Sequence, residues 1–380
     1  MHLPIFDSPK ISVYIHWAFC ESLCPYCDFN SYVATQPISQ KQWLIGYLNA
    51  FNMQKPYFQH KPIKSIFFGG GTPSLMEPDT IYQLINYWEN HNKSLGINSK
   101  IPEVTLESNP STFEVAKFEE FKQAGVTRLS TGVQSFNSKN LEFLGRKHSV
   151  AEAVFALERS CEIFHNTSFD LIMGLPQQSL KNFQEDLKVA CSLAKYHVAI
   201  YQLTIEKGTL FYKRKIPELP EDLAIEFYNE ALVSLENVGL KQYEISNFAV
   251  AGYESIHNLN YWLGGEYLGF GPNASGRVFN EGWYGTKEFK NPKVWLSKAL
   301  AKESLLVENI PITKQERFEE IVLTILRVNK ALPAFIVKEL PPSKVTKLIT
   351  EKLLAYQGGN LFTTAKGKLC LNYVIQTLLI

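Results

Sequence analysis

Three cysteines stand within eight residues of one another near the amino end of the chain. Cys20, Cys24 and Cys27 have the spacing C-x3-C-x2-C in the stretch YIHWAFCESLCPYCDFN. Thiolates this close together repel one another unless a cation holds them, so the spacing predicts a metal centre. The other three cysteines are scattered, and for two of them, in helical segments, a buried, unreactive thiol is the simpler interpretation.

Two kinds of metal centre fit this loop. A [4Fe–4S] cluster takes a cysteine thiolate at each iron, so three cysteines leave one iron open for chemistry. Zinc requires four ligands, and His16 could add a nitrogen to the three sulfurs. A lone histidine that alternates with Tyr14 along a strand is more often a packed residue, so the iron–sulfur cluster is favoured. A zinc-stabilised, non-catalytic interaction protein stays open as an alternative.

The elements that must position this loop follow a β–α rhythm as far as about residue 240. Runs rich in Val, Ile, Phe and Tyr alternate with helical periods, which predicts an α/β fold with a parallel sheet. Six such units are too few for a closed eight-fold barrel, so we expect an open, partial (β/α)6 TIM-like barrel. The expected strands cover residues 11–17, 64–70, 103–108, 127–135, 168–174 and 197–203.

Polar and glycine residues recur where these strands end. In a β/α barrel the carboxyl ends of the strands form the edge that carries the active site. The motifs are GGGTPS, ESNP, GVQSF, LGRKH and DLIMGLP, and we expect them to converge although they are far apart in sequence. Their candidate site residues are Gly70, Gly71, Thr72, Glu107, Gln134, Arg146 and Asp170.

The pattern changes after residue 240, which predicts three regions: a barrel over 1–240, a linking region over 241–310 and a C-terminal module over 311–380. The linking region is rich in Tyr, Trp, Asn and Gly, with strands expected at 243–248 and 266–271. The last region reads as helix, short hairpin across Gly358 and Gly359, then helix, and it resembles a winged-helix module. We expect this module to have a structural or protein-contact role.

Composition narrows the class of protein. The chain has 380 residues, of which 45% are hydrophobic, and a formal net charge of +1. Such a balance predicts a sizeable core and gives no reason to expect nucleic acid as a partner. The first ten residues lack the basic and apolar segments of a signal peptide, and no apolar run approaches the roughly 20 residues of a membrane helix. We therefore expect a cytoplasmic protein without a transmembrane segment.

The cysteine spacing, with an aromatic residue before the last cysteine, resembles the signature of the radical S-adenosylmethionine (SAM) family. The resemblance implies that SAM chelates the open iron and that the strand-end residues listed above surround it. Gly70, Gly71 and Thr72 would meet the amino group of SAM, Glu107 would meet the ribose hydroxyls or the amino group, and Arg146 would pair the carboxylate. Tyr14 would lie against the methionine end, and Tyr26 would add an apolar shell. No side chain is assigned as catalytic.

The order of motifs along nearly the whole chain resembles the oxygen-independent coproporphyrinogen III oxidase-like proteins and, within them, the heme-chaperone (HemW) branch. True oxidases carry a fourth cysteine, and Phe29 stands at that position here. The resemblance implies a heme chaperone that passes heme to a hemoprotein acceptor. An electron donor such as a flavodoxin or ferredoxin is also implied. The alternative is oxidative decarboxylation of coproporphyrinogen, a step of porphyrin biosynthesis.

The stretch HNLNYW (257–262) also resembles the chaperone branch. His257 is a candidate axial ligand of heme iron, since imidazole is a common one; a packed interior histidine is the alternative. Two departures from the family pattern stand out: Ala18 replaces the usual proline before the cluster, and Ser275 replaces a histidine in GPNASG.

Overall fold

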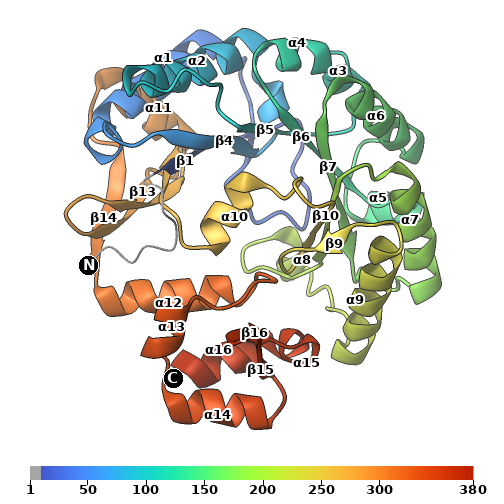
Figure 1. The fold of residues 1–380 in the computed structure, drawn as a ribbon. Helices are drawn as coiled ribbons and strands as arrows, with labels where there is room; N and C mark the ends of the chain where they lie inside the picture. The colour runs from blue at the N-terminus through green and yellow to red at the C-terminus, as the bar shows by residue number, and fades with distance from the viewer. Residues whose placement is uncertain (1–9, 380) are drawn as a thin grey trace.

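A computed structural model describes residues 10–379 as a curved, open sheet with helices on its convex side (Figure 1). The sheet contains twelve strands in the order β14-β13-β12-β11-β1-β4-β5-β6-β7-β8-β10-β9. Its central strands are parallel, which confirms the expected partial barrel. These are β1 (Ile11–Trp17), β4 (Ile63–Gly70), β5 (Glu103–Ser108), β6 (Arg128–Gln134), β7 (Asn166–Met173), β8 (His197–Gln202) and β11 (Tyr267–Phe270).

The six expected β–α strands are all present, and a seventh parallel strand joins them. β11 comes late in the chain and pairs with β1 on the side opposite to β4. The expectation of a strand over 266–271 is thereby confirmed. β1, which leads into the cysteine loop, is therefore central in the sheet, and the strands on both sides of it fix its position.

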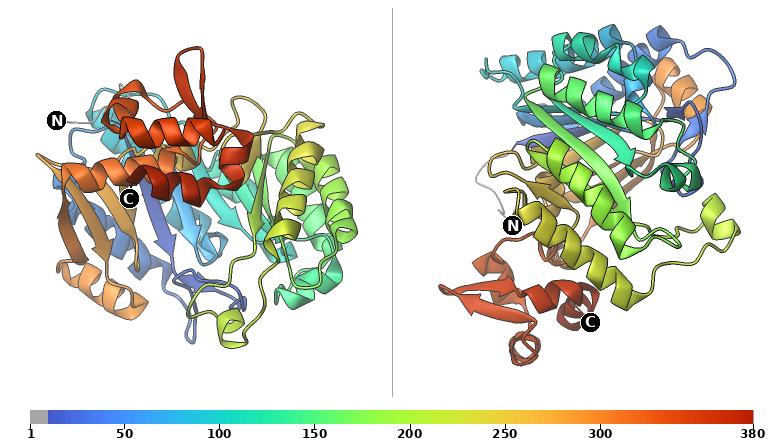
Figure 2. Two further views of the ribbon diagram at one scale, coloured as in Figure 1. Left: turned by 90° about the horizontal axis from the view of Figure 1, so that it is seen from below. Right: turned by 90° about the vertical axis from the view of Figure 1, so that its right-hand side faces the viewer.

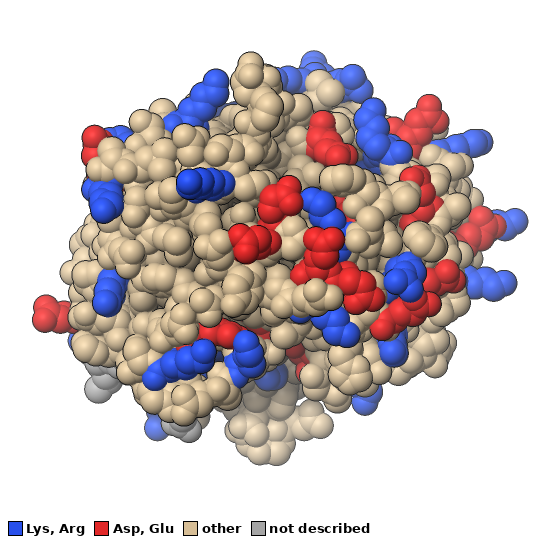
Figure 3. Space-filling model, turned by 90° about the horizontal axis from the view of Figure 1, so that it is seen from above, with Lys and Arg blue, Asp and Glu red and all other residues tan. Residues whose placement is uncertain are grey.

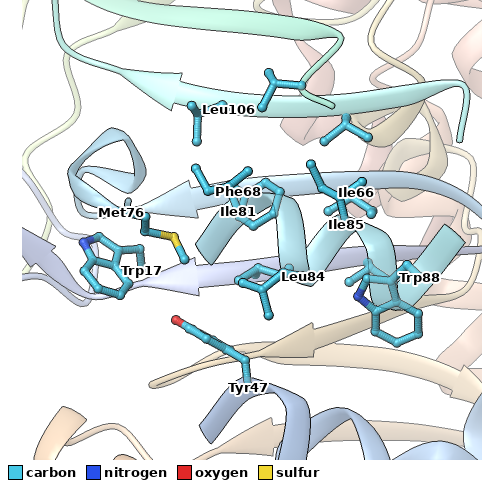
Figure 4. Close-up of a cluster of buried hydrophobic side chains, with 14 of the residues drawn as sticks. Trp17, Tyr47, Ile66, Phe68, Met76, Ile81, Leu84, Ile85, Trp88 and Leu106 are labelled. Atoms are coloured by element: carbon cyan, nitrogen blue, oxygen red, sulfur yellow. The ribbon is translucent and has the colours of Figure 1, made fainter. Parts of the chain in front are cut away.

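Helices cover the convex side of the parallel sheet. They are α1 (Gln40–Met53), α2 (Pro78–Ser94), α3 (Thr112–Val115), α4 (Phe118–Gln123), α5 (Ser138–Phe143), α6 (Val150–Ile163), α7 (Leu180–Leu193) and α9 (Glu221–Glu236). The short helix α8 (Leu210–Lys213) instead lies beside the cysteine loop. In α2 the buried residues Ile81, Leu84, Ile85 and Trp88 recur at helical spacing. They pack with strand residues such as Phe68 (Figure 4). This apolar layer fixes the strand ends that carry the polar motifs.

Antiparallel strands extend both edges of the sheet. They are β9 (Lys241–Gln242), β10 (Asn247–Ala249), β12 (Ser275–Phe279), β13 (Trp283–Glu288) and β14 (Leu306–Ile312). The expectation of a single strand over residues 243–248 is wrong for most of that range. Residues 243–246 form a turn between β9 and β10, in which the carboxylate of Glu244 accepts hydrogen bonds from the chain that follows it.

One helix lies on the concave side of the sheet. α10 (Ile256–Trp262) stands within the curve of the strands in Figure 1, beneath β4. His257 and Tyr261 face the barrel interior, since the His257 ring lies 5.0 Å from that of Phe67 on β4. Leu259, Trp262 and Leu263 instead pack into the hydrophobic core of the C-terminal region. α10 therefore belongs to two cores.

The C-terminal region forms a layer beside the barrel (Figure 2). Its elements are α12 (Lys314–Ile325), α13 (Ala334–Glu339), α14 (Pro342–Thr350), β15 (Leu354–Gln357), β16 (Asn360–Thr363), α15 (Ala365–Leu369) and α16 (Leu371–Leu379). The earlier helix α11 (Pro292–Ala301) instead packs against α1 on the barrel. β15 and β16 form the expected hairpin across Gly358 and Gly359. The winged-helix assignment and the borders at residues 240 and 310 stay predictions.

The surface carries charges of both signs. On the face seen in Figure 3, Lys and Arg are interspersed with Asp and Glu. None of the helices in the described range 10–379 has the length and apolar character required to cross a membrane. The expectation that concerns a signal peptide falls almost wholly on residues 1–9, which lie outside the described residues.

Candidate functional site

A cavity of about 400 Å³ opens at the carboxyl edge of the parallel strands. The loop after β1 and the ends of β4 to β8 form its walls, as expected for a β/α barrel. The structure brings together all three cysteines of the cluster and most of the other predicted site residues. Those that line the cavity are Cys20, Cys24, Cys27, Tyr26, Gly70, Gly71, Thr72, Glu107, Gln134, Arg146 and Asp170.

The three thiols come from one short loop between β2 (Phe19–Cys20) and β3 (Tyr32–Val33). The backbone N–H of Cys27 donates to the carbonyl of Cys24 at 3.1 Å, so the last two cysteines share a tight turn. Burial raises the pKa of the Cys20 thiol to about 11, and the neighbouring thiols add to the rise. Such thiols are protonated at neutral pH, and a bound cation would hold them as thiolates.

The donor set fits an iron–sulfur cube better than a single ion. Among residues 10–379, no group of three or more His, Cys, Asp or Glu is close enough to hold one metal ion. His16, the fourth ligand of the zinc alternative, has both ring nitrogens in use. Its Nε2 donates to the carbonyl of Asn30 at 2.9 Å, and its Nδ1 accepts from the Tyr14 hydroxyl at 3.0 Å. Three thiols on one loop match the sulfur ligands that a [4Fe–4S] cluster takes.

The glycine run at the end of β4 is hydrogen-bonded to the segment that leads into the cysteine loop. The N–H groups of Gly71 and Thr72 donate to the carbonyls of Trp17 and Phe19, at 2.7 and 2.8 Å. A Cβ at Gly71 would lie 2.6 Å from the Phe19 carbonyl oxygen, and one at Gly70 would lie 2.5 Å from the His16 ring. Only glycine allows this approach, so the run has a packing role in addition to any contact with a ligand.

Two carboxyl groups face the cavity with few donors near them. Glu107 accepts one hydrogen bond, from the N–H of Gly70 at 3.1 Å. Burial raises the pKa of Glu107 to about 8, and the charge of Asp170 contributes to the rise. Burial also raises the pKa of Asp170 to about 6, against the lowering effect of Arg128 and Arg146. Both groups can therefore accept hydrogen bonds from hydroxyl or ammonium groups of a ligand.

Arg146 supplies the positive charge beside the thiols. One of its Nη atoms donates to the Asn109 side chain at 2.6 Å and to the Gly132 carbonyl at 2.7 Å. The other Nη lies 3.5 Å from the Cys24 sulfur. The Nε is buried and has no hydrogen-bond partner among the described residues. Because Arg146 lines the cavity, its guanidinium charge fits an anionic ligand group such as a carboxylate.

Gln134 and Tyr26 reach the cavity for different reasons. Gln134 has a left-handed backbone with φ of 74°, next to a register shift between β6 and β7. A bulge of this kind turns a side chain away from the regular alternation of a strand. Tyr26 lies on the cysteine loop and contacts the ring of Phe211 from the segment after β8. The N–H of Phe211 also donates to the carbonyl of Pro25 at 2.9 Å, so that segment holds the cysteine loop in place.

Two predicted site residues lie outside the cavity. Tyr14 is in the barrel interior, where its hydroxyl bonds to His16 and its ring contacts Phe67. His257 is 1% exposed, and both of its ring nitrogens are hydrogen-bonded, to Ser65 Oγ at 3.0 Å and to the Tyr261 hydroxyl at 2.7 Å. The roles of Tyr14 toward SAM and of His257 toward heme stay predictions.

Sequence reasoning missed several residues of the cavity wall. Asn109, in the motif ESNP, joins Arg146 to Thr72, and the end of β8 adds Tyr201 and Gln202. The position of Asn109 just after a strand is the signal that indicates a site residue. The carboxylate of Glu107 in the same motif is the more obvious candidate.

Comparisons with known proteins show which proteins this chain is similar to in sequence and fold. Residues 14–190 match the model of the radical SAM superfamily. The chain is 33% identical to the heme chaperone HemW of Buchnera aphidicola from Acyrthosiphon pisum, over 99% of this chain and 100% of that protein. It is 39% identical to the heme chaperone HemW of Escherichia coli K12, over 71% of each chain. The solved coproporphyrinogen III oxidase HemN of Escherichia coli has the same fold, with a TM-score of 0.81, 20% identity, and coverage of 99% of this chain and 91% of that one.

Proposed function

Because this chain belongs to the radical SAM superfamily and, within it, to the family of the heme chaperones HemW, we propose that it binds heme and passes it to a hemoprotein acceptor. The single observation that carries this proposal is the similarity to chaperone relatives over almost the entire chain. Phe29 supports the proposal, because the coproporphyrinogen III oxidases that the chain resembles have a fourth cysteine at this position. The Phe29 side chain is 59% exposed at the mouth of the cavity.

The proposed cofactors follow from the donor set of the cavity. Cys20, Cys24 and Cys27 would hold a [4Fe–4S] cluster, and SAM would occupy the space between this loop and the strand ends. When bound, this pair of groups supplies one-electron chemistry to the site. The electron would come from a small redox protein such as a flavodoxin or ferredoxin. We place the protein in the cytoplasm, as the sequence predicts.

The side chains of the chain would bind and orient SAM. The guanidinium group of Arg146 suits its carboxylate, while Glu107 and Asp170 can accept hydrogen bonds from its ammonium or ribose hydroxyl groups. Thr72 and Gln134 add neutral polar groups to the wall, and Tyr26 excludes water beside the thiols. Each role is a matter of binding and orientation, and none requires a side chain to react.

The heme ligand is a separate part of the proposal. For His257 to bind heme iron, its bonds to Ser65 and Tyr261 must break and α10 must leave the barrel interior, because the ring is buried in this conformation. Heme ligation by His257 would thus be coupled to opening of α10. A ligand from the surface would need no such opening.

Hemin titration and turnover together test the function. We expect hemin to give a shifted Soret band with the purified protein, and the band to move to an added apo-hemoprotein. Under anaerobic conditions with coproporphyrinogen, SAM and a reductant, we expect no protoporphyrinogen. Turnover would favour the oxidase alternative. An unchanged Soret band in His257→Ala would reject that histidine as the ligand and leave the chaperone proposal standing.

A further inference from the structure

Two residues outside the predicted set connect the separate halves of the cavity wall. Asn109 follows β5, and Glu114 lies in the short helix α3. The Asn109 side chain donates from Nδ2 to Thr72 Oγ1 at 3.2 Å and accepts at Oδ1 from Arg146 at 2.6 Å. One amide group therefore spans from the loop after β4 to the loop after α5.

Glu114 fixes the position of Asn109 through its backbone. Its carboxylate accepts from the backbone N–H of Asn109 at 2.7 Å and from the hydroxyl of Ser74. Glu114 and Ser74 are both fully buried. One oxygen of the Glu114 carboxylate accepts both hydrogen bonds, and the other has no partner among the described residues. The two donors come from the loops that follow neighbouring strands. The loop after β4 and the loop after β5 are thus tied together at one buried group.

The Asn109 contact also decides which nitrogen of Arg146 is available. With one Nη bound to Asn109 and to the Gly132 carbonyl, the guanidinium plane is fixed. The other Nη is then directed to the Cys24 sulfur, and the Nε has no partner. If the amide were absent, the first Nη would lose its best acceptor and the guanidinium could rotate about its long side chain.

We propose that Asn109 and Glu114 are positioning residues that hold Thr72 and Arg146 at a fixed separation across the SAM site. Neither residue needs to react, and Glu114 does not line the cavity. The inference rests on the proposed function in that it takes SAM as the ligand. The positioning itself is a property of the protein chain and can be measured without a ligand.

Hydrogen–deuterium exchange of the full chain, as purified without SAM, tests the positioning. Glu114→Ala removes the one carboxylate oxygen that accepts both hydrogen bonds, whereas glutamine could keep an acceptor oxygen in that place. We expect the backbone amides of residues 71–76 and 109–115 to exchange at least several-fold faster in this variant. Unchanged exchange over residues 71–76 would overturn the proposal. Asn90→Leu, an exposed site on α2, serves as the matched control and should leave both segments unchanged.

Equilibrium dialysis of SAM with cluster-loaded protein tests the consequence. Asn109→Leu removes both hydrogen bonds, one of them to a charged group, so we expect SAM affinity to fall about tenfold or more at unchanged iron content. Asn109→Asp keeps an acceptor for Arg146 and should restore affinity to within about threefold of wild type. Wild-type affinity in Asn109→Leu would overturn the proposal. Failure of the wild-type protein to bind SAM would instead reject the proposed cofactor, and the exchange experiment would still decide the positioning.

Discussion

Glu103 and Glu107 lie on the same strand, β5, four residues apart, yet their surroundings are opposite. Glu103, at the start of the strand, accepts hydrogen bonds from Ser255 Oγ and from the backbone N–H groups of Ile256 and His257, and so fixes the beginning of α10. Glu107, near the end, has the single N–H of Gly70 and faces the cavity. The carboxylate at one end of the barrel interior (the closed end) is therefore fully paired within the protein, whereas the carboxyl group at the other end (the open end) faces the cavity with a single donor.

This difference teaches how to tell a binding site from a buried polar network. At the closed end His257 and His197 also use both ring nitrogens within the protein. At the open end Glu107 has a single donor and its pKa is raised to about 8. A carboxyl group with few donors and a raised pKa beside a cavity indicates a ligand, whereas histidines whose ring nitrogens are all bound within the protein indicate structural stability.

The largest expected effect is loss of the cluster at the open end. Replacing Cys20, Cys24 and Cys27 together by serine should reduce iron and inorganic sulfide, after anaerobic reconstitution, to less than about a tenth of the wild-type content, because the thiolate ligands are gone. His257→Ala, at the closed end, should retain both elements. Equal iron in the triple variant and the wild type would contradict the assignment of the cluster.

The second effect is on stability and separates the two carboxylates. Glu103→Ala should lower the free energy of unfolding by about 3 kcal/mol, because three donors at the start of α10 lose their acceptor and those of Ser255 and His257 stay buried. Glu107→Gln should change it at pH 5 by about 1 kcal/mol or less, since its one donor keeps an acceptor oxygen and little of the pH-dependent loss of the wild type has occurred at that pH. Urea unfolding of the cluster-free proteins measures both values. Similar losses for the two variants would remove the contrast between the ends.

The third effect is the pH dependence that Glu107 confers. Its pKa is raised from 4.5 to about 8 in the folded protein, so between these values the folded state holds a proton that the unfolded state has released. The stability contribution of the neutral Glu107 is therefore full below about pH 4.5 and is lost as the pH rises toward 8.

Urea unfolding at pH 5 and pH 8 checks this sign. Compared with Glu107→Gln, the cluster-free wild type should lose on the order of 2 kcal/mol more stability over this range. The groups that face Glu107 are Asp170, Arg128, Tyr14 and Tyr201, from four different strands, and Tyr261 from α10, and Gln leaves all of them in place. Identical pH slopes in the two proteins would contradict the raised pKa.

The smallest effect concerns the neutral hydrogen bonds at the closed end. Tyr261→Phe removes the hydroxyl that bonds to His257 Nε2 at 2.7 Å and leaves the ring in place. We expect a loss of about 1 kcal/mol in the free energy of unfolding, the usual contribution of one neutral hydrogen bond. Tyr82→Phe, at an exposed site of α2, is the control. A loss as large as that of Glu103→Ala would mean that the histidine, and not the carboxylate, holds α10.

The sequence predicted the strands and the cysteine site well because both depend on local patterns. The strand over residues 11–17 is found with its expected ends, and the thiols at positions 20, 24 and 27 meet in one cavity. Alternation of apolar runs and helical periods needs no distant information. Motifs at strand ends converge by topology alone, so Glu107 and Asp170 could be placed together although 63 positions separate them.

What the sequence could not supply were contacts set by tertiary packing. Nothing local to HNLNYW indicates that Ser65 and Glu103, far earlier in the chain, would enclose His257. In the same way, the acceptor role of Glu114 depends on the approach of Ser74 from another loop. The turn around Glu244 was mistaken for a strand because its aromatic and β-branched residues suit both.

α10 has a consequence for protein engineering, because one of its faces lies in the barrel and the other in the C-terminal core. Exchanging C-terminal modules between relatives at residue 311 would leave Leu259 and Leu263 against a foreign surface. A chimera joined just before Ser255 would instead carry the helix with the module it packs against, and its β11 would then have to pair with β1 of the recipient barrel.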